Sequence, residues 1–400
     1  MDIEEKIALV QRPPTEEIVT LNELRTLFET RASPKHYIGL EISGKLHLGS
    51  LIIPGFKIND FIKAGIQSNV FLADWHTYIN NKLNNDWTLI EKISQYYEKA
   101  FKFFCPGVNI IFGSDLYKET DDYWKNFIIF SKQITLARTL RSLTIMGRTE
   151  KDSLDFSQLL YPSMQSVDIK ALDLDIVHAG TDQRKIHMLV REVFPKLNWK
   201  VPVSVHHHIL PGLSEPTLIN SSYSTANTTN NTSNVSLSGT HSGISSMTAS
   251  SSDGAISAST ITNELLSASE SLNMNNNNFD DYRIFNKMSK SNPLSSILIH
   301  DSEQEISYKI NKAYCPLGVS KDNPILEIME YIIFHQYNEI IIERPSKYGG
   351  NISYSSIDQI KLDYEQKKIH PKDLKLTTSR YLDKIISPVR KHLQNNIVQF

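Results

Sequence analysis

A short run late in the chain, residues 287–291 (Lys-Met-Ser-Lys-Ser), places two ammonium groups and two hydroxyls within one turn's reach. Such groups can hold a polyphosphate whose charge shifts during a reaction, because they neutralise negative charge and donate hydrogen bonds. Lys287 and Lys290 are therefore candidate catalytic residues. Taken alone, the run is more typical of a solvated loop, so its interpretation depends on a second motif.

The second motif is residues 43–50 (Ser-Gly-Lys-Leu-His-Leu-Gly-Ser), which join a predicted strand to a predicted helix. The first turn of a helix offers unpaired N–H groups and the positive end of the helix dipole to an anion. His47 lies in that turn and could donate a hydrogen bond to a phosphate oxygen. The pattern is neither the G-x-G-x-x-G motif nor a P-loop, which argues against the usual dinucleotide and Walker sites.

The elements that must position these motifs are short apolar runs separated by longer helical stretches. Runs of this kind predict parallel strands covered on both faces, and hence an α/β fold. The predicted strands are residues 37–42, 68–74, 108–115, 174–180 and 201–205. Ligands bind at the carboxyl ends of the strands in such sheets. The polar clusters at 41–50, 74–76, 114–115 and 180–183 lie at those ends.

The length of 400 residues predicts two domains, because one hydrophobic core rarely serves so long a chain. We expect an N-terminal helical extension and then a parallel-sheet domain that contains a helical insertion, followed by a mainly α-helical domain that is helical from residue 353 to the end. A Ser/Thr/Asn-rich stretch reads as a disordered insertion, because it cannot bury enough apolar surface to offset the entropy of ordering. The expected ranges are 1–30 for the N-terminal extension, 31–300 for the parallel-sheet domain and about 116–172 for its helical insertion. They are 301–400 for the mainly α-helical domain and about 214–280 for the disordered insertion.

A third polar cluster lies just before the fourth predicted strand. If residues 161–168 are helical, Tyr161, Gln165 and Asp168 recur at i, i+4 and i+7 and share one face. A buried polar face needs partners, which makes it a candidate binding surface, although a solvated helix face would look the same. Gln183 adds an amide at a strand's carboxyl end.

Together, the two motifs, in this order and separation, resemble the paired signatures of class I aminoacyl-tRNA synthetases, whose catalytic domain is Rossmann-like. In that family the two motifs embrace ATP, which Mg²⁺ accompanies. The family's first motif usually ends in a second histidine, whereas this chain has Ser50, which can donate a hydrogen bond but carries no charge. The resemblance implies ATP-binding roles for Gly39, Glu41, Gly44, His47, Gly49, Ser50, Met288, Ser289 and Lys290.

The residues of this polar face closely resemble those of tyrosyl-tRNA synthetases of the archaeal and eukaryotic type. The resemblance extends from about residue 37 to residue 400, apart from the disordered insertion. The resemblance implies that Asp168 accepts a hydrogen bond from the phenol of tyrosine and that Tyr37 shares it. Tyr161, Gln165 and Gln183 would hold the α-amino group. Tryptophanyl-tRNA synthetase and a noncatalytic RNA-binding relative remain the alternatives.

The same resemblance implies partners beyond the small substrates. The 301–400 domain would bind the anticodon of tRNA(Tyr), with Tyr348 stacking on its first base and His370 and Asp373 bonding the base edge, tools suited to unpaired RNA. Arg184, and less surely Lys185, would face the acceptor stem. A core aromatic for Tyr348 and structural salt bridges for the two cations are the alternatives. The helical insertion would form a homodimer interface.

Composition is that of a soluble globular chain. The chain is 40% hydrophobic and 22% charged, with a formal net charge of −2, which argues against bulk nonspecific nucleic-acid affinity. The acidic N-terminus is unlike a signal peptide, and no apolar run approaches the ~18–20 residues needed to span a bilayer. Cys105 and Cys315 form no disulfide pattern, so we expect both to be buried, reduced thiols and the location to be cytoplasmic. We expect no metal site, and a structural role for residues 206–208 (His-His-His).

Overall fold

The computed structural model describes residues 1–148, 153–218, 283–284, 288 and 294–394. Lys287, Ser289 and Lys290 lie outside these residues, as does most of the insertion predicted at about 214–280. The chain divides into two compact units, 1–216 with 285–400, and 217–284. Within the smaller unit, the described strands β7 (Thr217–Leu218) and β8 (Arg283–Ile284) pair antiparallel.

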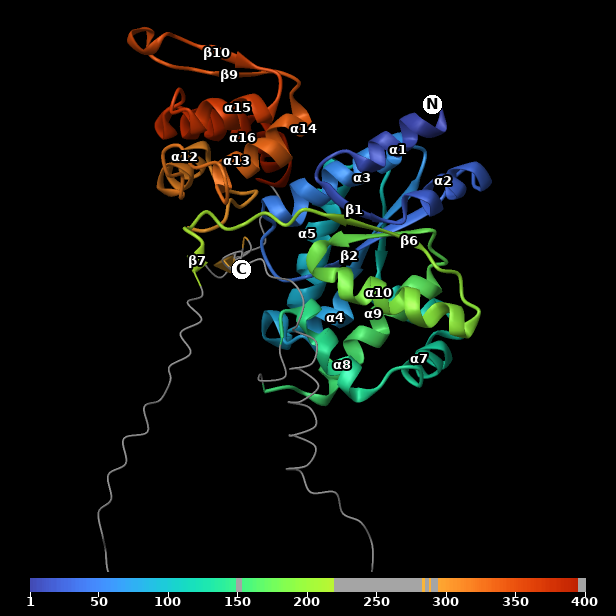
Figure 1. Ribbon diagram of the computed structural model, residues 1–400. Coiled ribbons are helices and arrows are strands. Elements are labelled where there is room, and N and C mark those ends of the chain that lie inside the picture. Colours follow the sequence, from blue (N-terminus) through green and yellow to red (C-terminus); the bar gives the residue numbers. More distant parts are fainter. Residues whose placement is uncertain (149–152, 219–282, 285–287, 289–293, 395–400) are drawn as a thin grey trace, which may run out of the picture. The chain divides into compact units, whose positions relative to one another are not determined.

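The larger unit is built on a six-stranded sheet, visible in Figure 1, with the strand order β1-β6-β5-β2-β3-β4. Strands β2 to β6 pair in parallel with their neighbours, whereas β1 pairs antiparallel with β6. The strands are β1 (Thr15–Val19), β2 (Lys35–Glu41), β3 (Gln67–Ala73), β4 (Asn109–Phe112), β5 (Ile176–Gly180) and β6 (Val203–His207). The predicted parallel sheet is therefore confirmed.

The N-terminal segment differs from the prediction, because it is not purely helical. Helices α1 (Ile3–Gln11) and α2 (Leu21–Thr30) flank β1, which extends the sheet at its edge. Both helices begin with a capping box, made by Asp2 with Glu5 and by Thr20 with Glu23. The helical extension predicted for residues 1–30 was thus wrong for residues 15–19, which form an edge strand of the six-stranded sheet.

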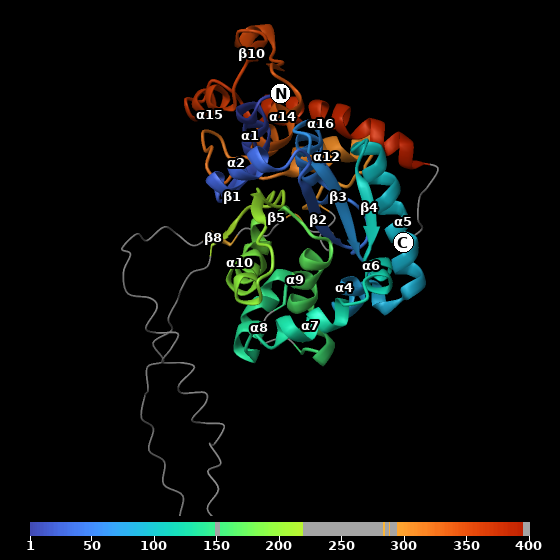
Figure 2. The same ribbon diagram turned by 90° about the vertical axis from the view of Figure 1, so that its right-hand side faces the viewer.

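Helices cover both faces of the sheet. Because successive strand residues point to opposite faces, neighbouring residues pack against different helices. Ile38 on β2 packs in one cluster with α3 (Ile53–Lys63) and α5 (Trp87–Phe104), and α5 runs alongside β4 in Figure 2. Its neighbour Tyr37 packs in a second cluster, which includes residues from the helices of the other face. Those helices are α7 (Tyr123–Ser131), α9 (Tyr161–Ala171) and α10 (Arg184–Val193).

Between β4 and β5 the chain is mainly helical in its described part. This region contains α6 (Gly113–Glu119), α7, α8 (Leu136–Ser142), the short turns η3 (Leu143–Met146) and η4 (Phe156–Leu160), and α9. After β3, α4 (Asp74–Ile79) leads through the turn η2 (Lys82–Asn85) into α5. Of these elements, α4 directly follows the carboxyl end of β3, and α6 directly follows the carboxyl end of β4.

The C-terminal part is mainly helical, as predicted, and its orange and red elements lie together in Figure 1. The elements are α12 (Glu303–Lys312), α13 (Pro324–Ile328), the π-helical turn η7 (Met329–Ile333), α14 (Phe334–Gln336), β9 (Ile340–Ile342), β10 (Ile352–Tyr354), α15 (Ile357–Glu365) and α16 (Pro371–Leu393). The β9–β10 hairpin corrects the prediction of continuous helix from residue 353. Residues on both sides of position 300 share one core cluster, so the domain boundary there remains a prediction. None of the described helices is long and apolar enough to cross a membrane.

Candidate active site

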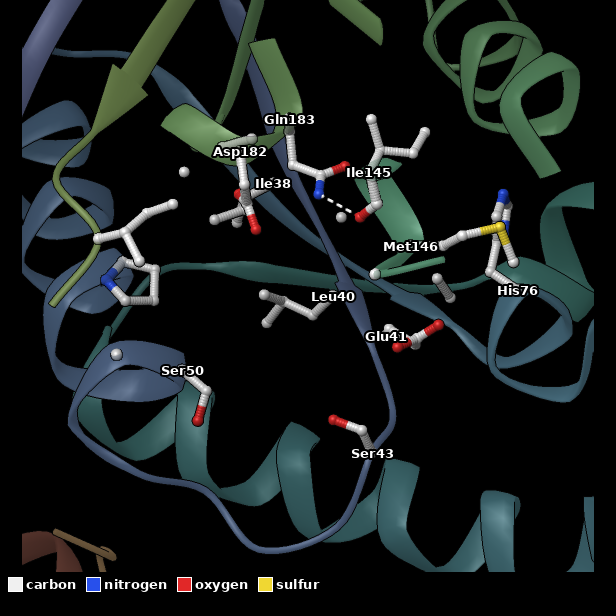
Figure 3. Close-up of a pocket in the computed structure, with 18 of the residues that line it drawn as sticks. Ile38, Leu40, Glu41, Ser43, Ser50, His76, Ile145, Met146, Asp182 and Gln183 are labelled. Carbon is white, nitrogen blue, oxygen red and sulfur yellow. Dashed lines mark hydrogen bonds between the residues drawn. The ribbon is translucent and has the colours of Figure 1, made fainter. Parts of the chain in front are cut away.

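A cavity of about 540 Å³ opens at the carboxyl ends of β2 and β5. Figure 3 shows Ser43 and Ser50 on one side of it and Asp182 and Gln183 on the other. The predicted site residues that line the cavity are Tyr37, Gly39, Glu41, His47, Gly49, Ser50, Tyr161, Gln165, Asp168, Gln183 and Met288. Gly44 does not line it. This residue instead has a φ of 111°, and its carbonyl accepts a hydrogen bond from the hydroxyl of Tyr97 at 2.9 Å.

The motif of residues 43–50 ends in a closed turn at the start of the π-helical turn η1 (Leu48–Ile52). His47 is the residue before this turn, and its Nδ1 accepts a hydrogen bond from the Gly49 N–H at 3.2 Å. Because Nδ1 is an acceptor, the hydrogen of the neutral ring is on Nε2. His47 can thus donate from Nε2 to a phosphate oxygen.

Ser50, which stands where the family usually has histidine, completes this turn. Its Oγ accepts a hydrogen bond from the His47 N–H at 2.8 Å and lies 3.2 Å from the His47 carbonyl oxygen, to which it can donate. The hydroxyl therefore stabilises the turn that holds His47. A contact of Ser50 with ATP stays a prediction.

Asp168 lines the cavity and is 1% exposed. Its Oδ1 accepts a hydrogen bond from the hydroxyl of Tyr123 at 2.7 Å, and its Oδ2 lies 3.6 Å from Nε2 of His76. Burial raises the pKa of Asp168 to about 8. Burial, and next the charge of Asp168, raise the pKa of the Tyr37 hydroxyl, which is 2% exposed. The site combines a buried acceptor with aromatic walls, as a phenol requires.

The sequence did not reveal the residues that support Asp168. Tyr123 comes from α7, 45 residues before Asp168, and no local pattern connects the two helices. His76 follows β3 in a polar cluster that had no assigned role, and its Nδ1 lies 3.4 Å from the hydroxyl of Tyr117. Burial lowers the pKa of His76 to about 3, so its ring is neutral and can donate from only one nitrogen.

Two amides line the cavity between α9 and the end of β5. Gln183 donates a hydrogen bond to the Ile145 carbonyl at 2.7 Å, drawn as a dashed line in Figure 3, and its Oε1 accepts one from Gln165 Nε2 at 3.3 Å. The Oε1 of Gln165 is buried and has no hydrogen-bond partner among the described residues. A buried carbonyl oxygen without a partner is unfavourable, and a bound ammonium group would satisfy it.

The residues predicted to contact tRNA lie elsewhere on the larger unit. Arg184 is paired with Glu17 at 2.8 Å, which is the structural salt bridge considered as its alternative, and Lys185 donates to Thr144 at 3.0 Å. Tyr348 lies in the turn between β9 and β10 and is 62% exposed, which excludes a core role.

His370 caps the N-terminus of α16. Its Nδ1 accepts a hydrogen bond from the Lys372 N–H at 3.1 Å, and Asp373 lies in the same first turn. His370 is exposed and Asp373 is half-buried, so both can be reached from solvent. Their proposed base contacts stay predictions.

Each of the three consecutive histidines has its own partners. His206 contacts His187 and Glu17, His207 contacts His178, and His208 contacts Glu16 and Glu327. Over the described part of the chain, no group of three His, Cys, Asp or Glu side chains could hold a metal ion. Cys105 and Cys315 are free thiols; Cys105 is buried and Cys315 half-buried.

The sequence matches the profile of class I tRNA synthetases (W and Y) over residues 29–247 and 285–387. The chain therefore belongs to the class I tRNA synthetases of this tryptophan and tyrosine family. Among its relatives is the tyrosine–tRNA ligase of Thermococcus sibiricus, which is 38% identical over 414 residues, covering 99% of this chain and 96% of the relative. The predicted resemblance to the archaeal tyrosyl enzymes is confirmed.

Solved structures agree with the sequence relatives. The tyrosyl-tRNA synthetase of Pyrococcus horikoshii complexed with L-tyrosine has a TM-score of 0.78 and 36% identity, covering 99% of this chain and 97% of that one. The tyrosyl-tRNA synthetase of Archaeoglobus fulgidus complexed with L-tyrosine has a TM-score of 0.75 and 31% identity, covering 98% and 100%. The predicted fold class is thereby confirmed.

Proposed function

We infer that the chain is a tyrosine–tRNA ligase. A carboxylate oxygen of tyrosine attacks the α-phosphorus of ATP, the bond to the leaving pyrophosphate breaks, and tyrosyl-adenylate forms. A hydroxyl of the terminal ribose of tRNA(Tyr) then attacks the tyrosyl carbonyl carbon and releases AMP. The observation that carries this inference is Asp168, a buried hydrogen-bond acceptor in the wall of the cavity.

The cavity provides groups for both ends of tyrosine. Asp168 accepts a hydrogen bond from the phenol hydroxyl of tyrosine, and the Tyr37 hydroxyl is the second hydrogen-bond partner of that phenol. At the other end, the buried Oε1 of Gln165 accepts from the α-ammonium group, and Tyr161 and Gln183 complete that corner. A site that hydrogen-bonds a substrate hydroxyl discriminates strongly against an analogue without it, because its polar groups are then left unpaired.

The nucleotide lies on the His47 side of the cavity. His47 donates from Nε2 to a phosphate oxygen, and Gly49 keeps the backbone open, since a Cβ there would lie 3.2 Å from the His47 ring. Gly39 and Glu41 line the same cavity, as does Met288. Mg²⁺ enters with ATP as part of the substrate. Lys287 and Lys290 neutralise the leaving pyrophosphate; this role rests on their residue types and the family signature.

Further partners follow from surface features. We assign tRNA contacts to Arg184, Tyr348, His370 and Asp373, of which Tyr348 has the exposure that base stacking needs. A homodimer interface on the helical insertion is supported by apolar side chains that the single chain leaves exposed. These include Trp124 (53%), Ile128 (57%) and Leu136 (63%). The enzyme acts in the cytoplasm.

Amino-acid-dependent exchange of pyrophosphate into ATP tests the proposed function. We expect exchange with tyrosine, and none with tryptophan or phenylalanine at the same concentration. Exchange with tryptophan alone would show a tryptophanyl enzyme, and no exchange with any of the three would show a noncatalytic relative. Lys287→Ala should reduce the exchange rate, and an unchanged rate would refute the role of that lysine.

A further inference from the structure

One histidine in the cavity wall, His208, has no part in the chemistry above. It follows β6 directly, and its side chain is 17% exposed. A carboxylate oxygen of Glu16 contacts its Nδ1, and Oε2 of Glu327 lies 2.8 Å from its Nε2. Each carboxylate accepts a hydrogen bond, so both ring nitrogens must carry hydrogen and the ring is an imidazolium.

The surroundings of His208 hold this cation firmly. Burial, the largest single influence, lowers its pKa, but the hydrogen bonds and the charges of Glu16 and Glu327 together outweigh burial and raise the pKa to about 9. The ring stacks on Tyr331, with centroids 3.9 Å apart and planes at 16°. Its backbone N–H donates to the Pro14 carbonyl at 2.8 Å. His208 is therefore fixed by β1 on one side and by the C-terminal helices on the other.

The helical run of residues 324–336 presents one face to the sheet domain. Glu327, Tyr331 and His335 recur at i, i+4 and i+8. At the far end of this face His335 stacks on Phe56, with centroids 4.2 Å apart, and its Nε2 lies 3.1 Å from Oδ2 of Asp60 on α3. The run is thus attached at both ends, and only the His208 end reaches the cavity wall.

The residues after His208 connect it to the nucleotide side of the cavity. Ile209 and Leu210 both line the cavity, and the Leu210 carbonyl accepts a hydrogen bond from the Met288 N–H at 3.0 Å. Leu210 and Met288 share a hydrophobic cluster with Leu48 of the motif of residues 43–50. Tyr37, on the tyrosine side, belongs to a different cluster. A shift of His208 should therefore disturb ATP binding more than tyrosine binding.

We propose that His208 is a positioning residue for ATP: bridging Glu16 and Glu327, it fastens the C-terminal helices to the cavity wall that holds Met288. The inference rests on the proposed function, because it concerns ATP binding in tyrosine activation. Displacing the run of residues 324–336 would move Ile209 and Leu210, and through Leu210 the backbone at Met288.

The test compares His208→Gln and Glu327→Gln in tyrosine-dependent pyrophosphate exchange on the full chain. Each variant should raise the KM for ATP roughly tenfold, which corresponds to about 1.4 kcal/mol, and leave the KM for tyrosine within about twofold. The double variant should resemble the single ones, because both changes remove the same bridge. Glu327→Gln keeps the test valid if His208→Gln does not fold.

Glu330→Gln is the matched control. Glu330 lies on the same helical run, but it pairs with Lys361 at 2.6 Å, so its substitution should leave both KM values unchanged. Equal rises in the two KM values, multiplicative effects in the double variant, or an unchanged KM for ATP would each overturn the positioning role. If the wild-type chain shows no tyrosine-dependent exchange, the proposed function itself fails.

Discussion

Asp168→Asn should stabilise the protein while impairing its selectivity. The substitution keeps an oxygen that can accept from Tyr123 but replaces the titratable carboxyl group with a neutral amide. Burial raises the pKa of Asp168 to about 8, against an ordinary value of about 4. The folded protein therefore keeps a proton that the unfolded chain has lost. The free energy of unfolding from this group is highest below pH ~4 and falls as pH rises towards ~8.

The magnitude follows from the size of the pKa shift. Each pKa unit corresponds to about 1.4 kcal/mol, so three units between pH 4 and 7 amount to about 4 kcal/mol at most. Because the asparagine side chain of the variant does not titrate, its advantage in free energy of unfolding should grow by up to ~1.4 kcal/mol per pH unit between pH 5 and 7. Above pH ~8 the advantage should level off.

Urea denaturation at pH 5, 6, 7 and 8 measures this slope. Exchange assays with tyrosine and phenylalanine measure selectivity, which should fall roughly two- to tenfold, as expected when a hydrogen bond worth ~0.5–1.5 kcal/mol is lost. Asp175→Asn is the control. Asp175 is also buried, but it contacts Arg31 and Lys200, so its substitution should destabilise the protein. A pH-independent stability difference for Asp168→Asn would refute the reasoning.

Two further substitutions test separate parts of the site. Ser50→Ala removes the acceptor for the His47 N–H and should lower the free energy of unfolding by about 1 kcal/mol and raise the KM for ATP; unchanged values in urea denaturation and exchange would contradict the capping role. Tyr348→Ala should leave stability and exchange unchanged, because the side chain is exposed, yet lower kcat/KM for tRNA about tenfold, as expected if a stacked base contributes ~1–3 kcal/mol. A loss of exchange activity would place Tyr348 in a structural role.

The sheet was predictable where each strand is a continuous apolar run, because burial on both faces leaves no room for polar residues. Strand β1 escaped notice because two glutamates, Glu16 and Glu17, interrupt it. An edge strand can carry them, and here their partners, His208 and Arg184, come from far along the chain. The β9–β10 hairpin was missed because each of its strands has only three residues, too few for a periodic signal.

The site was predictable where function follows one helix face. Tyr161, Gln165 and Asp168 lie on α9 and all reach the cavity, as their spacing required. Tyr123 could not be found in this way, because its bond to Asp168 joins two helices whose packing is a tertiary property. The role of Ser50 was local, three residues from His47, but histidine is not among the preferred N-cap residues, so the capping pattern did not stand out.

The histidines at 207 and 208 show what sequence pattern alone cannot supply. They are adjacent and chemically identical, yet burial lowers the pKa of His207 to about 4, whereas the two carboxylates raise that of His208 to about 9. His207 contacts the ring of His178 at 2.7 Å, an uncharged partner. The charge of an imidazole is therefore decided by groups that the fold brings to its two nitrogens. Glu16 and Glu327 lie far apart in the sequence, so the charge of His208 is a property of the assembled fold.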